Sequence, residues 1–109
     1  MRIFSIGEEV DRETLFDSLG LSYRGEYVIL FVGKLAAFKG VDTLLRTARR
    51  YEWLADREFI TLIAGDGEER ERLSELHKQL GLRNTFFLGN QKQDELRRLY
   101  NAAAVFVMP

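Results

Sequence analysis

Hydrophobic positions along the chain predict strands and helices in alternation. Four runs lack polar alternation, which is typical of strands buried on both faces: residues 27–32, 59–64, 85–88 and 104–108. Apolar residues at intervals of three or four predict helices over residues 11–19, 40–54, 68–80 and 93–102. This order predicts an α/β fold, a Rossmann-like parallel sheet of about four strands with helices on both faces.

The predicted helices have distinct inward and outward faces. The helix over residues 40–54 turns inward Val41, Leu44, Leu45, Ala48 and, at the margin, Tyr51. Its opposite face carries Arg46, Arg49 and Arg50, which is typical of a solvated surface. The two later helices are built on Leu73, Leu76 and Leu80, ending before Gly81, and on Leu96, Leu99 and Tyr100. The first helix begins at Asp11 as its N-cap and ends before Gly20.

Length and charge limit the classes of protein that fit. The 109 residues argue for one domain over residues 1–109, in which residues 1–22 form a linker-like segment and the short first helix. A formal net charge of −1 gives no sign of a whole-domain surface for nucleic acid or membranes, although a local basic patch is compatible with it. The absence of cysteine excludes disulfides, thiolate metal sites and cysteine nucleophiles, and it is compatible with a reducing compartment.

Neither targeting nor membrane-spanning signals are evident in the sequence. The longest apolar run, residues 27–32, is too short to cross a bilayer, and the first nine residues turn acidic too early for a signal peptide. We therefore expect a cytoplasmic protein. The chain stops at Pro109, directly after a strand-like run, where domains seldom end without a capping element. We therefore also expect a truncated domain.

Candidate chemistry gathers at the carboxyl ends of the predicted strands, where ligands bind in parallel α/β sheets. Three strands end at Gly33, Gly65 and Gly89, and glycine lets the backbone turn sharply and a ligand approach closely. The first loop adds Lys34 and Lys39 and leads into a helix N-terminus, which suits a phosphate or diphosphate. Two solvated lysines in an ordinary loop are an equal alternative, because this loop matches neither the Walker A motif nor the dinucleotide fingerprint.

The turns after the second and third strands offer weaker candidates. The backbone of Gly65, Asp66 and Gly67 would face the same crevice, whereas we interpret the Asp66 carboxylate as a helix cap. Asn90 and Gln91 carry side-chain amides that can read the edge of a nucleobase, although a plain turn also accounts for them.

Other polar and aromatic residues indicate structure rather than chemistry. We place His77, the only histidine, on the exposed side of its helix beside Lys78. No cluster of His, Asp and Glu has metal-ligand spacing, and no Ser-His-Asp arrangement can be assembled, so we expect no metal site. Trp53 and Phe59 are expected to pack the turn between the second predicted helix and the second predicted strand.

Several motifs in a fixed order resemble a known family. They are Phe31-Val32-Gly33-Lys34-Leu35 with Lys39-Gly40-Val41-Asp42, Ile63-Ala64-Gly65-Asp66-Gly67, Phe87-Leu88-Gly89, and Val105-Phe106-Val107-Met108-Pro109. Nearly the whole chain is similar to the first part of the C-terminal, donor-binding domain of retaining glycosyltransferases of family 4 (group 1), which have the GT-B fold. The resemblance implies that the chain is a truncated half of such a domain.

The resemblance also implies an activity, the transfer of a sugar from a nucleotide-sugar, such as a UDP- or GDP-sugar, to an acceptor hydroxyl with retention. In the family an Arg and a Lys of the first loop neutralise the leaving diphosphate, which implies catalytic roles for Lys34 and Lys39. Donor-binding roles are implied for Gly33, Lys34, Lys39, Gly65, Asp66, Gly67, Gly89, Asn90 and Gln91. Neither a cofactor nor a bound metal is implied.

The chain departs from the family pattern at three places. Lys34 replaces the usual Arg and so loses a bidentate fork on phosphate while keeping the charge. Ala104 stands where the family usually has Asp, and residues 7–11 only loosely resemble the linker motif. The family's downstream acidic motif would lie beyond Pro109 and its acceptor domain before Met1. We therefore expect that the isolated chain does not catalyse transfer.

Two rival interpretations remain open on the sequence. A non-catalytic remnant or interaction module of the same fold could form a dimer through an exposed sheet edge. A receiver-like signalling domain has a similar α/β shape, but it needs acidic residues at the end of the first buried strand, where this chain has Gly33-Lys34.

Overall fold

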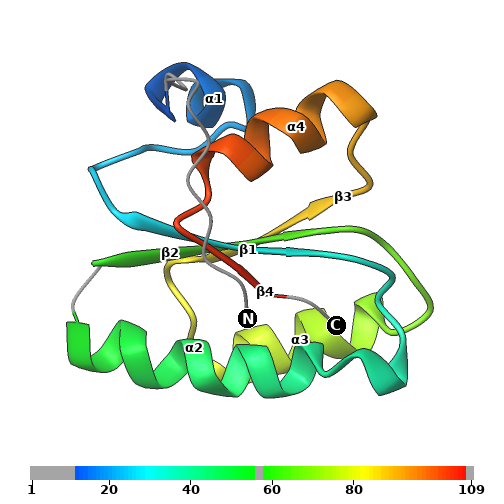
Figure 1. The fold of residues 1–109 in the computed structure, drawn as a ribbon. Helices are drawn as coiled ribbons and strands as arrows, with labels where there is room; N and C mark the ends of the chain where they lie inside the picture. Colours follow the sequence, from blue (N-terminus) through cyan, green and yellow to red (C-terminus); the bar gives the residue numbers. More distant parts are fainter. Residues whose placement is uncertain (1–11, 56–57, 108–109) are drawn as a thin grey trace.

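The chain folds into alternating strands and helices, described by the computed structural model over residues 12–55 and 58–107 (Figure 1). The elements in chain order are α1 (Arg12–Ser18), β1 (Tyr27–Val32), the 3-10 turn η1 (Ala37–Lys39), α2 (Val41–Ala55), β2 (Phe59–Ala64), α3 (Arg70–Leu80), β3 (Thr85–Gly89), α4 (Gln93–Ala102) and β4 (Val105–Val107). The alternation predicted from the hydrophobic pattern is confirmed.

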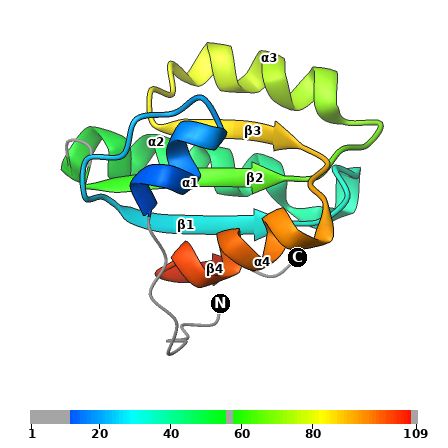
Figure 2. The ribbon, with the colours of Figure 1, turned by 90° about the horizontal axis from the view of Figure 1, so that it is seen from above.

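The four strands form one parallel sheet in the order β3-β2-β1-β4, which confirms the α/β class. All four arrows in Figure 2 point the same way, so the loops that follow β1, β2 and β3 emerge at one edge of the sheet. The central pair β1 and β2 is in register over its whole length, from Tyr27 opposite Phe59 to Val32 opposite Ala64. Between β2 and β3 the register shifts at Ile63/Ala64, just before these loops.

Helices cover both faces of the sheet, with α1 and α4 on one side and α2 and α3 on the other (Figure 1). Because side chains alternate along a strand, each face has its own hydrophobic core. Under α1 and α4 the buried residues include Phe16, Val28, Leu30, Leu62 and Leu99. Under α2 and α3 they include Phe31, Leu45, Ala48, Ile63 and Leu73. These positions confirm that the central strands β1 and β2 are buried on both faces, whereas most of β3 and all of β4 are half-buried.

The bounds of several elements differ from the sequence-based expectation. Helix α3 begins at Arg70, because the two glutamates before it form a turn in which the Glu69 amide donates to the Leu35 carbonyl at 3.0 Å. The turn η1 was not foreseen, and in it the Lys39 amide donates to the Ala36 carbonyl at 3.1 Å. Strand β3 extends to Gly89. Asp11, Met108 and Pro109 lie outside the described residues.

The placement of His77 differs from the prediction of a surface histidine. The ring is half-buried and faces β3, with Nε2 at 2.6 Å from the Thr85 carbonyl oxygen. The ring also packs on Phe87, with centroids 5.7 Å apart. Since His77 comes four residues after the buried Leu73, the helical period places both on the inward face of α3.

The end of α2 also corrects one expectation and supports another. Trp53 does not pack the turn after α2, because its side chain is 83% exposed. Phe59 does pack there, with its ring 5.5 Å from that of Tyr51. Arg46, Arg49 and Arg50 are exposed, as predicted. The helical period explains the difference, since Tyr51 follows Ala48 on the inward side and Trp53 falls outside it.

A half-buried carboxylate, that of Glu52, joins α2 to the turn before β3. Its Oε1 accepts hydrogen bonds from the backbone amides of Arg83 at 2.6 Å and Asn84 at 3.1 Å. Its Oε2 accepts the hydroxyl proton of Thr85 at 2.6 Å. Charge-assisted bonds of this kind fix the edge of the sheet where the strands begin, opposite the edge where the loops gather.

Candidate functional site

The loops at the carboxyl edge of the sheet are joined by backbone hydrogen bonds. The Gly33 amide donates to the Ala64 carbonyl at 3.0 Å, and the Leu35 amide donates to the Asp66 carbonyl at 3.0 Å. The Gly65 amide donates to the Gly89 carbonyl at 2.7 Å. The loops after β1, β2 and β3 therefore form one continuous backbone surface.

Two glycines in the second loop allow this close contact. A Cβ atom on Gly65 would lie 1.9 Å from the Gly33 carbonyl oxygen, and the φ of Gly65 is +140°. A Cβ on Gly67 would lie 2.4 Å from the Leu35 carbonyl oxygen. Both distances are far inside van der Waals contact, so only glycine fits. The sequence predicted the sharp turns, but the group that approaches these glycines is the backbone of the first loop.

A pocket of about 360 Å³ lies along these loops. Its lining residues are Val32, Gly33, Lys34, Ala64, Gly65, Asp66, Asn90, Gln91 and Leu96. Six of the nine residues predicted for donor binding therefore lie together. The sequence reasoning did not assign Val32, Ala64 and Leu96 to the site; they supply an apolar side, and Leu96 was predicted only as a core residue of its helix.

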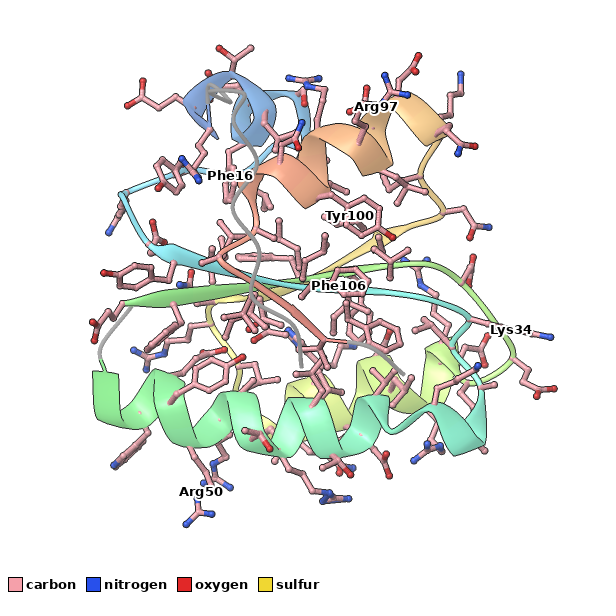
Figure 3. All side chains as sticks on the ribbon, viewed as in Figure 1. Phe16, Lys34, Arg50, Arg97, Tyr100 and Phe106 are labelled. Atoms are coloured by element: carbon pink, nitrogen blue, oxygen red, sulfur yellow. The ribbon has the colours of Figure 1, made fainter. Side chains whose placement is uncertain are left out.

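The polar side chains of the pocket differ in how firmly they are held. Lys34 is exposed and extends beyond the end of the sheet (Figure 3). Gln91 is oriented by its Nε2, which donates to the Leu88 carbonyl at 2.9 Å. Asn90 is exposed beside it. The pocket thus presents one outward cation and two amides at the mouth of an apolar recess.

Asp66 does not cap α3, so the interpretation of its carboxylate as a helix cap is wrong. The N-cap residue of α3 is Glu69, and no side chain caps the helix there. Instead Asp66 Oδ1 accepts a hydrogen bond from the Gly67 amide at 2.8 Å, and Oδ2 lies 3.6 Å from Arg70 Nη1. The carboxylate therefore stabilises the turn itself.

Arg70 is a residue near the site that the sequence reasoning missed. Besides its ion pair with Asp66, its Nη1 lies 3.4 Å from the position that a Cβ on Gly89 would take. Its guanidinium therefore lies between the second and third loops. The spacing of four residues from Asp66 was the signal in the sequence.

Three predicted site residues do not line the pocket. Gly67 is packed against Leu35, and Gly89 contributes its carbonyl oxygen to the loop contacts. Lys39 is half-buried at the end of η1, directly before Gly40, whose φ of +75° leads the chain into α2. The two lysines of the first loop thus lie in different settings, one at the pocket and one at the start of the helix.

The arrangement suits an anionic ligand that also has an apolar part. Lys34 offers a positive charge, whereas the opposite charges of Asp66 and Arg70 offset each other. The side-chain amides of Asn90 and Gln91 offer hydrogen-bond donors and acceptors. Among residues 12–55 and 58–107, no three His, Cys, Asp or Glu side chains are placed to hold a metal ion. In the same part of the chain no helix is both long and apolar enough to span a bilayer.

Comparison with known proteins gives a family match over residues 11–109, to the family described as glycosyl transferases group 1. An uncharacterized glycosyltransferase of Methanocaldococcus jannaschii is 40% identical over 85 residues, covering 77% of this chain and 21% of that protein. A 2-deoxystreptamine glucosyltransferase of Streptomyces kanamyceticus is 34% identical over 100 residues, covering 89% of this chain and 25% of that protein. The chain thus spans about a quarter of the length of these relatives.

A solved structure shows the same fold. The C-terminal domain of a group 1 family glycosyl transferase from Francisella tularensis matches with a TM-score of 0.74 at 20% identity. The match covers 97% of this chain and 55% of that one. The fold therefore resembles part of a GT-B C-terminal domain.

Proposed function

This chain belongs to the group 1 glycosyl transferases, and we propose that it forms the nucleotide-sugar-binding part of an enzyme that transfers a sugar to an acceptor hydroxyl with retention. The observation that carries this proposal is the pocket at the carboxyl edge, where Lys34, Asn90 and Gln91 meet over an interlocked backbone floor. Ligands of open parallel sheets bind at this edge.

The proposed role of Lys34 follows from the charge that develops in the reaction. As the bond between the sugar and the diphosphate breaks, negative charge grows on the leaving diphosphate. A cation fixed beside it stabilises the transition state more than the ground state. Lys34 lines the pocket and is exposed at its mouth, so its ammonium can contact a phosphate oxygen as a point charge.

We assign Lys39 to the same diphosphate as a second cation. It lies five residues beyond Lys34, where the first loop enters α2, and the start of a helix attracts anions through its partial positive charge. Since Lys39 does not line the pocket, this role requires the diphosphate to extend from the pocket toward the start of α2. The apolar recess and the amides of Asn90 and Gln91 would then receive the nucleobase.

A titration of the 109-residue chain with UDP and GDP tests the site. Amide NMR signals of Gly33, Gly65 and Gly89 should shift on binding, because these residues form the floor. Lys34→Gln should weaken binding about tenfold or more, since hydrogen bonds to charged groups contribute about 1.5–3 kcal/mol. Lys34→Arg should retain most of the affinity, because it keeps the charge.

The matched control is Lys78→Gln, an exposed lysine in the last turn of α3, away from the pocket. If the three glycine signals remain unchanged at saturating nucleotide, or if both Gln variants bind equally well, the proposed site is wrong.

We propose that the isolated chain does not transfer sugar. It spans about a quarter of the length of its curated relatives, so three quarters of the length of such an enzyme has no counterpart in it. The purified chain, incubated with UDP- or GDP-sugars and free acceptor sugars, should release no nucleoside diphosphate above the rate without protein. Nucleotide release that Lys34→Gln abolishes would contradict this expectation.

An interaction module of the same fold is the second candidate. Strands β3 and β4 are at the ends of the sheet order, and within the described residues each pairs with a single strand. An edge of this kind can pair with a strand from another chain. Light scattering distinguishes the candidates, because an interaction module should be a dimer whose mass does not depend on nucleotide. A monomer that binds UDP or GDP favours the donor-binding function.

A further inference from the structure

The outer face of α2 is a basic surface in a chain whose net charge is −1. Its exposed residues are Thr43, Arg46, Thr47, Arg49, Arg50 and Trp53, and none of the exposed side chains described in this helix is acidic. Figure 3 shows Arg50 pointing away from the sheet. The two acidic residues of α2 are half-buried and are bonded to backbone amides, Asp42 to that of Thr43 and Glu52 to those before β3.

Trp53 ends this basic face and is unusually exposed. Its side chain is 83% exposed, compared with 56% for Tyr27, the other large hydrophobic residue found on the surface of the described part. An exposed indole beside arginines is not explained by packing within the domain. Tryptophan prefers the boundary between water and an apolar phase, since its ring is apolar and its N–H is polar.

A hollow lies beside the last turns of α2 and borders this face. This hollow of about 360 Å³ lies between Arg49 and Trp53 of α2 and Arg83 of the turn before β3. Leu80 and Leu82 line it as well, and the Glu52 carboxylate there is occupied by its bonds to the backbone of the turn. Two guanidinium groups and an indole thus surround a recess large enough for a small anionic group.

We propose that the surface formed by Arg46, Arg49, Arg50, Trp53 and Arg83, here called the α2 surface, binds an anionic phospholipid membrane. The arginines would face the lipid phosphates, and Trp53 would lie at the headgroup level. The apolar side of α2 remains packed on the sheet, with Val41, Leu45 and Ala48 buried. Binding is therefore peripheral and needs no unfolding of the helix.

The acidic remainder of the domain does not prevent this contact. The molecule measures 35 × 30 × 26 Å, whereas charges are screened over about 8 Å at physiological ionic strength. A flat membrane therefore interacts mainly with the charges of the face that it touches. A nucleic-acid partner is less favoured, because domains that bind it are typically basic as a whole, with a pI above about 9, and this chain has a pI of about 5.9.

This inference is independent of the proposed function. The pocket at the carboxyl edge contains none of the five residues of the α2 surface. Loss of nucleotide binding would leave the membrane contact unchanged, and loss of membrane binding would leave the nucleotide pocket unchanged.

The single tryptophan of the chain reports on the contact directly. Vesicles of phosphatidylcholine with about one-third phosphatidylglycerol should shift the Trp53 emission to the blue at low salt, because the indole leaves water. Vesicles of phosphatidylcholine alone should cause no shift, and raised salt should reverse binding. The Arg49→Gln/Arg50→Gln variant should bind the anionic vesicles about 25-fold more weakly in sedimentation, since each basic residue near such a surface contributes roughly fivefold.

The matched control is Arg24→Gln/Arg97→Gln, which removes the same charge from exposed positions outside α2. Arg97 lies on α4, across the sheet from α2 (Figure 3). Both double variants should keep the circular dichroism of the parent chain, since all four side chains are exposed.

Four results would overturn the proposal. They are no binding to anionic vesicles at low salt, an equal loss in the control variant, sedimentation with vesicles while Trp53 emission is unchanged, and a blue shift that appears without vesicles as the chain dimerises. If single-stranded RNA shifts the emission and anionic vesicles do not, the surface binds nucleic acid instead.

Discussion

The close contact at Gly65 makes a sharp prediction for Gly65→Ala. The new Cβ would lie 1.9 Å from the Gly33 carbonyl oxygen, so the two loops must separate by about 1.5 Å to reach van der Waals contact. That movement strains the bonds from Gly33 to Ala64 at 3.0 Å and from Gly65 to Gly89 at 2.7 Å. Backbone strain, overpacking and weakened hydrogen bonds together should cost about 3–6 kcal/mol.

The assay is urea unfolding followed by circular dichroism, with Gly25→Ala as the matched control. Gly25 also has a positive φ, +85°, but a Cβ there meets nothing within 4 Å. Both variants reduce the freedom of the unfolded chain equally, so the difference between their free energies of unfolding reports the steric contact together with the difference in backbone strain between φ values of +140° and +85°. If Gly65→Ala is destabilised no more than Gly25→Ala, with equal m-values, the loops do not form the interlocked floor described above.

Three further predictions concern stability, each measured by urea unfolding. Glu52→Gln should lower the free energy of unfolding by about 1–3 kcal/mol, because the Glu52 carboxylate accepts three hydrogen bonds. The control Glu75→Gln, at an exposed position, should change it by less than about 0.5 kcal/mol, and equal losses in the two variants would refute the role of Glu52. Burial raises the pKa of the Tyr51 phenol above 10.0, so the contribution of the neutral phenol to the free energy of unfolding is fully present below about pH 10 and is lost as the pH rises further. Tyr51→Phe should therefore flatten the decline of stability at alkaline pH, and an unchanged decline would contradict the burial of this phenol. Leu62→Ala, at a fully buried site, should lower the free energy of unfolding by about 2–5 kcal/mol, whereas Trp53→Ala, at an exposed site, should change it little. The reverse order would contradict the burial of Leu62 and the exposure of Trp53.

The sequence predicted the sheet well, because the fold depends on continuous apolar runs that glycines interrupt. The predicted bounds of β1 and β2 match the structure, as do those of α4. The start of α3 could not be predicted, since it depends on a backbone bond between Glu69 and Leu35, far apart in the chain. Local patterns contain no information about such a contact.

The candidate site was predicted in part for the same reason. Parallel strands bring their carboxyl ends together, which places Lys34 beside Asn90 and Gln91 without knowledge of loop shape. The position of Lys39 depends on the turn η1, which has no strong sequence signal. The errors at His77 and Trp53 were avoidable, because counting from Leu73 and Ala48 along the helices gives their observed faces.

The backbone floor has a consequence for how such a pocket can change during evolution. Residues 65 and 67 admit no side chain, because the carbonyl oxygens of Gly33 and Leu35 lie where a Cβ atom would stand. Natural variation in ligand preference therefore has few places to act. It falls on the side chains that line the pocket, above all those of Lys34, Asn90 and Gln91 at the rim, which can be exchanged without separating the loops.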